Sequence, residues 1–283
     1  MELICNELSF YPLADKVYEV ENRFQILLKA FKAAKLKFGF KKIRFQNNLS
    51  DQSVTEELNF VQAVSLFSRK DLKRTVLTFL KPPYFDDLTE AETDRFLESD
   101  YRIVDQGCPT DKEPFGLPVA HIKGVPAISI QSHSFWENNS IKVQKYSLDP
   151  QVAFNVPNIC VSNDCNSKEL SDWTATSLSR SISTKDELIR FLNFNIYKAN
   201  IQDDFFKQLS EWKDNEYKIY QHTLALMKDV EIHPFSGGMG KTENLKNRGK
   251  ECSKRITQEH RLSYSIEENT ITFIACKGHY KFH

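Results

Sequence analysis

The end of the chain contains a carboxylate, an arginine and a histidine whose types suit phosphodiester chemistry: Glu243, Arg261 and His279. Cleaving RNA without a metal requires a base that deprotonates the 2′-hydroxyl, an acid that protonates the leaving 5′-oxygen, and cations that stabilise the charge on phosphorus. Histidine suits the acid because its ordinary pKa is about 6.5. Arginine presents a planar fork to phosphate oxygens. These types suggest an RNA-cleaving site, although charged strand faces are more often solvated surface.

The surrounding segment is basic inside a neutral chain. The whole sequence carries 38 basic and 38 acidic residues, whereas Lys241 to Arg261 contain more than twice as many basic as acidic side chains. Such a local excess indicates a surface for a polyanion. We therefore predict that Lys241 and its basic neighbours contact RNA.

A glycine-rich stretch, "FSGGMGKT", precedes Glu243 and superficially resembles a phosphate-binding P-loop. The position of the leading glycine holds Phe235, and the stretch follows a predicted helix, where a P-loop needs a strand. Nucleotide hydrolysis is therefore not indicated.

Strand alternation places the charged side chains on one face of a predicted strand, "RITQEHRLSYSI". The predicted core face holds Ile256, His260, Leu262, Tyr264 and Ile266. The predicted charged face holds Arg255, Thr257, Glu259, Arg261 and Ser263. The apolar run "TITFIAC" that follows is typical of a central strand, and it would bring His279 and Tyr280 to the end of the sheet.

The elements before this segment indicate an α+β protein with two domains. Residues 1–165 alternate β-like runs with amphipathic helices and form an α/β or α+β domain of unknown type. Residues 166–192 form a polar linker with a short helix, which a capping box of Thr184 and Glu187 begins. Residues 193–283 contain two helices and then antiparallel strands. In the first domain, "FGLPVAHIKGVPAISIQ" indicates paired strands around Lys123 and Gly124.

Residues 29–45, "KAFKAAKLKFGFKKIRF", are basic and aromatic at once. This combination suits nucleic-acid contact. Lysines on the outer face of an amphipathic helix are the ordinary explanation.

Bulk properties exclude several classes of protein. The six cysteines lack CxxC spacing, so zinc and redox motifs are not indicated, and we expect no metal and no cofactor. The N-terminus lacks the features of a signal peptide, and no apolar run is long enough to span a bilayer. We therefore expect a cytoplasmic protein with no membrane contact.

The order of residues in the last fifty positions resembles the YoeB toxins, ribosome-dependent endoribonucleases of the RelE superfamily. The motifs that carry the resemblance are "HPF", "GKTENLK", "SKRITQEHRLSYSI" and "CKGHY". It implies a small antiparallel sheet with helices on one face, and cleavage of mRNA in the ribosomal A site through a 2′,3′-cyclic phosphate. By position it implies Glu243 as general base, Arg261 as transition-state arginine and His279 as general acid. The residues that it implies for RNA binding are Lys246, Lys254, Arg255, Glu259 and Tyr280.

The resemblance also implies partners: mRNA on the ribosome, a YefM-like antitoxin and a second copy of the toxin domain. Cys252 stands where the family usually has an aromatic residue, so a contact that shapes the site is in question. One alternative is a catalytically inactive module that binds RNA, a ribosome or an antitoxin. Another is gyrase poisoning, the activity of a branch of the superfamily that lacks this acid/base set. No catalytic signature accompanies His121 and His133 in the N-terminal domain, where we expect a regulatory or targeting role.

Overall fold

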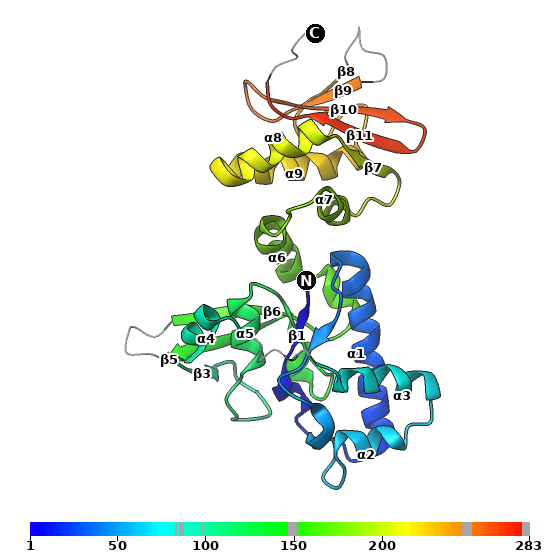
Figure 1. The fold of residues 1–283 in the computed structure, drawn as a ribbon, viewed down its shortest axis with the longest axis vertical. Helices are drawn as coiled ribbons and strands as arrows, with labels where there is room; N and C mark the ends of the chain where they lie inside the picture. Colours follow the sequence, from blue (N-terminus) through cyan, green and yellow to red (C-terminus); the bar gives the residue numbers. More distant parts are fainter. Residues whose placement is uncertain (83, 85–87, 98, 147–151, 245–250, 279–283) are drawn as a thin grey trace. The chain divides into compact units, whose positions relative to one another are not determined.

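The computed structural model describes residues 1–82, 84, 88–97, 99–146, 152–244 and 251–278 (Figure 1). The chain divides into two units, Met1–Ser177 and Leu178–His283, and each contains a sheet of its own. Both units combine helices with sheet, which confirms the predicted α+β class. Among the described residues, no helix is both long and apolar enough to cross a membrane.

The N-terminal unit is built on a mixed sheet in which the strand order is β2-β1-β4-β6-β5-β3. The first four strands are parallel neighbours, β5 pairs antiparallel with β6, and β3 pairs antiparallel with β5. The strands are β1 (Leu3–Cys5), β2 (Ile43–Arg44), β3 (Asp100–Ile103), β4 (Ala127–Ile128), β5 (Ser140–Tyr146) and β6 (Val152–Ile159). The helices are α1 (Val17–Phe38), α2 (Phe60–Ser65), α3 (Lys70–Leu77), α4 (Glu90–Leu97), α5 (Gly116–Ile122) and α6 (Lys168–Trp173).

The strand pair predicted around Lys123 and Gly124 is wrong, because helix α5 precedes these residues. The start of this helix is stabilised by Glu7, far away in the sequence, whose carboxylate accepts hydrogen bonds from the N–H groups of Phe115 and Gly116, both at 2.7 Å. These bonds satisfy two of the free donors at the start of the helix. Burial raises the pKa of the Glu7 carboxyl, although the two N–H groups oppose this effect.

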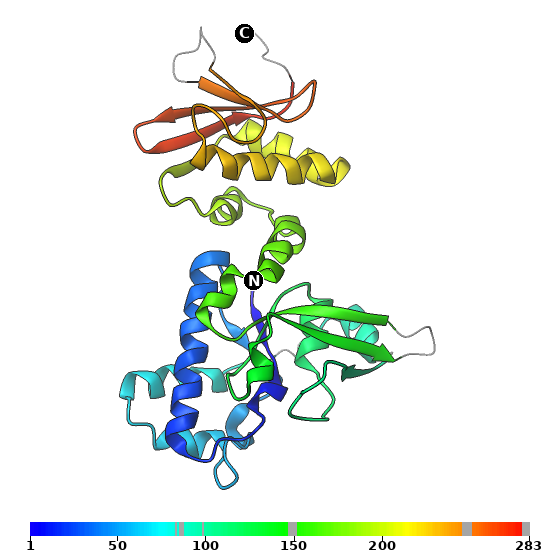
Figure 2. The same ribbon diagram turned by 180° about the vertical axis from the view of Figure 1, so that it is seen from behind.

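In the C-terminal unit two long helices, Asp203–Asn215 and Tyr217–Ile232, follow the first strand. They pack on one face of a five-stranded sheet of order β7-β11-β10-β9-β8 (Figures 1 and 2). Its helices are α7 (Lys185–Leu192), α8 (Asp203–Asn215) and α9 (Tyr217–Ile232). Its strands are β7 (Lys198–Ile201), β8 (Thr242–Asn244), β9 (Glu251–Arg255), β10 (Arg261–Glu267) and β11 (Thr270–Ala275). Neighbouring strands are antiparallel, except that β7 pairs parallel with β11.

Several local predictions for this unit are confirmed. Helix α7 begins with the capping box of Thr184 and Glu187, in which each side chain accepts the other residue's N–H at 3.2 Å. Strand β11 lies inside the sheet, as its apolar character predicted. The helices and strands share a core whose largest members are Phe205, Trp212, Tyr220, Tyr264 and Phe273, each at most 1% exposed.

The predicted strand "RITQEHRLSYSI" is wrong in its extent. The structure divides this segment into the end of β9, a turn at 256–260 and strand β10. The N–H groups of Ile256 and Thr257 donate to the carbonyl of His260 and close the turn. Side chains on the two sides of the turn therefore do not follow one continuous alternation.

Candidate active site

The pairing of β8, β9 and β10 sets which residues share a face. Glu243 lies opposite Ser253, which lies opposite Ser263, and Arg255 lies opposite Arg261. Directly paired residues point to the same side, and so do residues two apart. Glu243, Arg255 and Arg261 therefore share one face of the sheet. From strand spacing, the Cα atoms of Glu243 and Arg261 lie roughly 12 Å apart.

The opposite face of the same strands packs on the helices. Leu262, Tyr264 and Cys252 belong to it, and each is at most 3% exposed. Burial raises the pKa of the Cys252 thiol. The residue that replaces the family's usual aromatic thus lies in the core, away from the face of Glu243.

Glu243 keeps its carboxylate accessible. Its Oε1 lies 3.7 Å from Lys241 Nζ, and the two side chains are 38% and 76% exposed. Such an open ion pair contributes little to stability. A carboxylate in this position can take up a proton from a bound ligand, and Lys241 can contact an anion beside it.

Arg261 is only 5% exposed, and the turn at 256–260 holds its side chain. Its Nη1 donates to the carbonyls of Thr257, His260 and Gln258 at 2.8, 3.1 and 3.3 Å. Within the described part of the chain, its Nε is buried and has no acceptor. An unsatisfied buried donor is costly, so this nitrogen would bind an oxygen from a ligand favourably.

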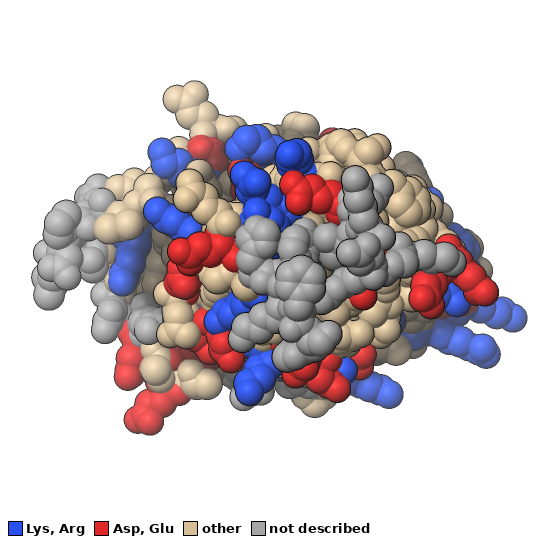
Figure 3. All heavy atoms as spheres, turned by 90° about the horizontal axis from the view of Figure 1, so that it is seen from above, with Lys and Arg blue, Asp and Glu red and all other residues tan. Residues whose placement is uncertain are grey.

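Arg255 and Glu259 are exposed, as their predicted contact with RNA requires. Arg255 forms no ion pair with any other described residue. Basic and acidic side chains are interspersed in the space-filling view (Figure 3).

The structure corrects the role of Lys254, which the family resemblance assigned to RNA binding. Lys254 is fully buried on the helix-facing side, opposite Leu262. Its Nζ binds Asp229 Oδ2 at 2.6 Å and donates to the carbonyls of Gly237 and Met239 at 3.0 and 3.1 Å. All of these partners belong to the protein, so Lys254 supports the loop before Glu243 and does not face a ligand.

Asp229, on α9, completes this buried arrangement. Its Oδ2 accepts the N–H of Met239 at 2.9 Å, and its Oδ1 lies 3.0 Å from His233 Nδ1. Burial would raise the pKa of the Asp229 carboxyl, but the hydrogen bonds with Lys254 and His233 outweigh burial and lower that pKa. The loop is thus fixed around a charged pair that joins α9 to β9.

The glycines of "SGGMG" fit the loop around this pair. Gly238 has φ +68°, and a Cβ there would collide with the Asp229 carboxylate. Gly240 has φ +73°, and a Cβ there would lie 2.7 Å from the Arg255 carbonyl oxygen. The glycines therefore serve close packing against a buried ion pair and not a phosphate cradle.

A second set of contacts fixes the chain just before its C-terminal motif. Gln208 Oε1 accepts the N–H groups of Cys276 and Lys277 at 2.8 and 2.9 Å. His260 Nδ1 accepts the N–H of Gly278 at 3.0 Å. The remaining predicted site residues, Lys246, His279 and Tyr280, lie outside the described residues.

The sequence analysis did not identify three residues that support the site: Gln208, Asp229 and His233. Asp229 and His233 are four residues apart, which places them on one face near the end of a helix. That spacing was the available signal for the pair. No local signal marks Gln208, because its partners lie 68 and 69 residues further along the chain.

The described residues contain no cluster of three or more His, Cys, Asp or Glu side chains placed to hold a metal ion.

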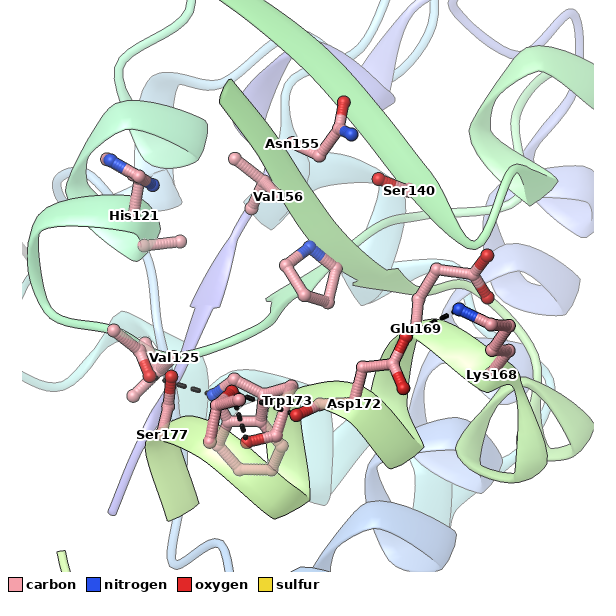
Figure 4. Close-up of a pocket in the computed structure, with 14 residues that line it drawn as sticks. His121, Val125, Ser140, Asn155, Val156, Lys168, Glu169, Asp172, Trp173 and Ser177 are labelled. Atoms are coloured by element: carbon pink, nitrogen blue, oxygen red, sulfur yellow. Dashed lines mark hydrogen bonds and ion pairs between the residues drawn. The ribbon is translucent and has the colours of Figure 1, made fainter. Parts of the chain in front are cut away.

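The N-terminal unit has a pocket of about 500 Å³ between α5, β6 and α6 (Figure 4). At its edge Lys168 and Asp172 form an ion pair at 2.7 Å, and Trp173 Nε1 donates to the Gly124 carbonyl at 2.8 Å. Burial lowers the pKa of His121, which stacks on Phe154. His121 lies on α5 and not on a strand as predicted.

Comparison with known proteins decides the family of the C-terminal unit. The profile of the YoeB-like toxins of bacterial type II toxin-antitoxin systems matches residues 201–280. Toxin YoeB of Escherichia coli strain K12 is 39% identical over 70 residues, which span 24% of this chain and 82% of that toxin. The chain belongs to the YoeB-like toxins. Toxin YoeB of a Synechocystis strain is 37% identical over 83 residues, 27% of this chain and 94% of that toxin.

Among solved structures, a YoeB dimer from Staphylococcus aureus is 30% identical, with a TM-score of 0.29, and the match covers 30% of this chain and all of that chain. A heterotetrameric YoeB-YefM toxin-antitoxin complex from the same species is 29% identical, with a TM-score of 0.28, covering 30% of this chain and 98% of that chain. The YoeB-like part is a toxin module of an endoribonuclease family. It occupies the C-terminal unit alone.

Proposed function

We propose that the C-terminal unit cleaves mRNA in the ribosomal A site by metal-independent attack of a 2′-hydroxyl on the adjacent phosphate. Glu243 takes the proton of the 2′-hydroxyl, and the freed O2′ forms a bond to phosphorus. The bond from phosphorus to O5′ breaks, and His279 gives that oxygen a proton. The products are a 2′,3′-cyclic phosphate and a free 5′-hydroxyl, so atoms and charge balance.

The observation that carries this proposal is the buried, unsatisfied Nε of Arg261 on the same sheet face as the accessible carboxylate of Glu243. A non-bridging phosphate oxygen would supply the acceptor that Nε lacks. Charge grows on those oxygens as O2′ attacks, so the contact strengthens in the transition state. Arg255 and Lys241 provide further cations next to this position, and Lys246, Glu259 and Tyr280 are assigned to RNA contacts by family position.

The test uses the full chain in a reconstituted translation reaction, with cleavage mapped by primer extension and the 3′ ends tested for cyclic phosphate. Glu243→Gln keeps the shape of the side chain and removes the base. We expect cleavage to slow by about 100- to 10,000-fold, the usual range for a general base. Glu267→Gln, an exposed change at the far end of β10, is the matched control and should cleave normally. Equal activity of both variants would refute the assignment of Glu243.

Ribosome dependence is measured separately on the same mRNA without ribosomes. Comparable rates with and without ribosomes would contradict cleavage in the A site, while leaving the acid/base chemistry intact.

We further propose that a YefM-like antitoxin neutralises this unit and that the N-terminal unit regulates or targets it. Ile232, Phe235 and Met239, near the loop that precedes Glu243, are exposed by 69%, 54% and 43%, which suits an apolar partner. A homodimer through the toxin unit is a further proposal. Co-expression with a YefM-type antitoxin should relieve growth arrest, and replacing Phe235 and Met239 by Ser should abolish that relief. Relief that survives this double change would contradict the proposed surface.

A further inference from the structure

The basic and aromatic segment 29–45 of the N-terminal unit, taken with its flanks as residues 22–50, separates into two parts in the structure. Residues 22–50 contain eight Lys or Arg residues and no Asp or Glu. Four of the segment's five aromatic side chains, Phe24, Phe38, Phe40 and Phe45, are at most 7% exposed and belong to the core, and Phe31 is half-buried. They therefore cannot act as a stacking platform for unpaired bases.

The basic residues of this segment divide in the same way. Half of them contact the protein itself: Arg23 donates to the Pro12 carbonyl, Lys37 to Asn166 Oδ1, Lys42 pairs with Glu2, and Arg44 pairs with Glu2 and donates to the Tyr84 carbonyl. The other half, here called the lysine face, comprises Lys29, Lys32, Lys35 and Lys41. All four are exposed, and no hydrogen bond or ion pair engages their side chains within the described part of the chain.

Helix geometry places three of these four lysines in one row. Lys29, Lys32 and Lys35 follow one another at steps of three residues on α1, the long blue helix in Figures 1 and 2. They span about 9 Å along the helix axis at 1.5 Å per residue. Lys41 follows the left-handed glycine, Gly39, that ends the helix.

Ordinary helix stabilisation explains only part of this pattern. Cations in the last turn interact favourably with the helix dipole, which accounts for Lys35. Lys29 and Lys32 lie one to two turns earlier, where this effect has faded, and the segment offers them no acidic partner at i ± 4. Unpaired like charges repel one another, so a polyanion bound to this face would relieve a local cost.

We propose that the lysine face binds the phosphate backbone of double-helical RNA. Four neighbouring aromatic side chains are buried and Phe31 alone is half-buried. One partly covered ring is no platform for successive bases, so binding is to phosphates, which suits a duplex better than a single strand. A membrane fits less well, since the apolar stripe of α1, which includes Val20, Leu27 and Ala34, is packed in the core and cannot enter lipid. This inference goes beyond the cleavage chemistry and does not depend on it.

The test measures binding of the full chain to a fluorescent 2′-O-methyl RNA duplex of about 20 base pairs, long enough for a phosphate-reading surface. The methyl groups remove the 2′-hydroxyl, so the toxin unit cannot cleave the probe by the proposed route. Affinity is followed by fluorescence anisotropy between about 50 and 200 mM salt, where counterion release makes log K linear in log salt. Changing Lys29, Lys32, Lys35 and Lys41 to Gln should weaken binding and reduce the magnitude of the slope by about 3 to 4, at about 0.9 per phosphate contact.

The matched control changes four exposed lysines of the same unit outside the segment: Lys16, Lys70, Lys81 and Lys142 to Gln. The control should keep the wild-type slope to within about one contact. Lys and Gln have similar helix propensities, so both variants should keep their thermal transitions. An equal loss of slope in the two variants would show that only the net charge matters and would overturn the proposal. Binding of the wild-type protein to vesicles of phosphatidylserine and phosphatidylcholine, without binding to the duplex, would also overturn it.

Discussion

The buried pair of Lys254 and Asp229 supports a quantitative prediction. Replacing Lys254 by Met keeps the volume of the side chain and leaves the Asp229 carboxylate, only 11% exposed, without its main partner. Breaking a buried ion pair costs about 3 to 5 kcal/mol. Asp229 keeps its contacts with His233 and the Met239 N–H, so we expect a value near the lower limit, about 3 kcal/mol. For a unit of this size that lowers the midpoint by about 12 to 24 °C.

The assay is calorimetry of the full chain, in which the transition of the C-terminal unit is followed separately from that of the N-terminal unit. Lys241→Met is the control, because it removes the same charge from an ion pair that is open to solvent. Its effect should stay below about 1 kcal/mol. The double change of Lys254→Met with Asp229→Asn should cost clearly less than the sum of the single changes, because the uncompensated charge is gone. A small effect of Lys254→Met, or strict additivity, would refute the view that this pair holds the loop.

Three further predictions concern the same unit. Because the pKa of Asp229 is lowered on folding, its contribution to stability is present at neutral pH and is lost as pH falls through the folded pKa, so Asp229→Asn should flatten the acid branch of stability below about pH 4. Denaturant titrations at a series of pH values measure this, and parallel acid branches would argue against it. Gly238→Ala should destabilise the unit by at least about 2 kcal/mol more than Gly237→Ala, because both residues have positive φ but only at Gly238 does a Cβ meet Asp229. Urea unfolding of the two variants compares them, and equal losses would contradict the packing argument. Gln208→Leu should cost about 2 kcal/mol and slow mRNA cleavage by displacing the chain before His279; unchanged unfolding and cleavage would show that these contacts are dispensable.

Periodicity allowed the helices of the C-terminal unit to be predicted, because their side chains face core and solvent at fixed steps, and a nearly unbroken apolar run marked its central strand. It failed at residues 256–260, where a turn interrupts the alternation without a glycine or proline to mark it. The prediction that Arg255 and Arg261 share a face is confirmed nonetheless, because the two residues lie directly opposite each other in the ladder. Lys254 was misplaced for another reason: its counterion lies 25 residues earlier in the sequence.

The N-terminal unit shows the same limit. Helix α5 contains residues that fit a strand, and it forms because Glu7 satisfies its first N–H groups across 108 and 109 residues of sequence. A contact of that kind leaves no trace in the local pattern. Residue types near the site could be predicted from chemistry and family resemblance, whereas the supporting residues depend on contacts that only the folded chain brings together.

Strand β7 has a practical consequence for anyone who isolates the toxin unit. The family match begins at residue 201, yet β7 begins at Lys198 and pairs with Thr270–Phe273 of β11. A fragment that starts at residue 201 would lack most of β7, so β11 would become an edge strand. Its unpaired backbone N–H and C=O groups could then pair with a strand of another molecule. A fragment for expression should therefore begin upstream of Lys198. Otherwise a low yield caused by aggregation will be misread as a sign that the fragment is toxic to the host.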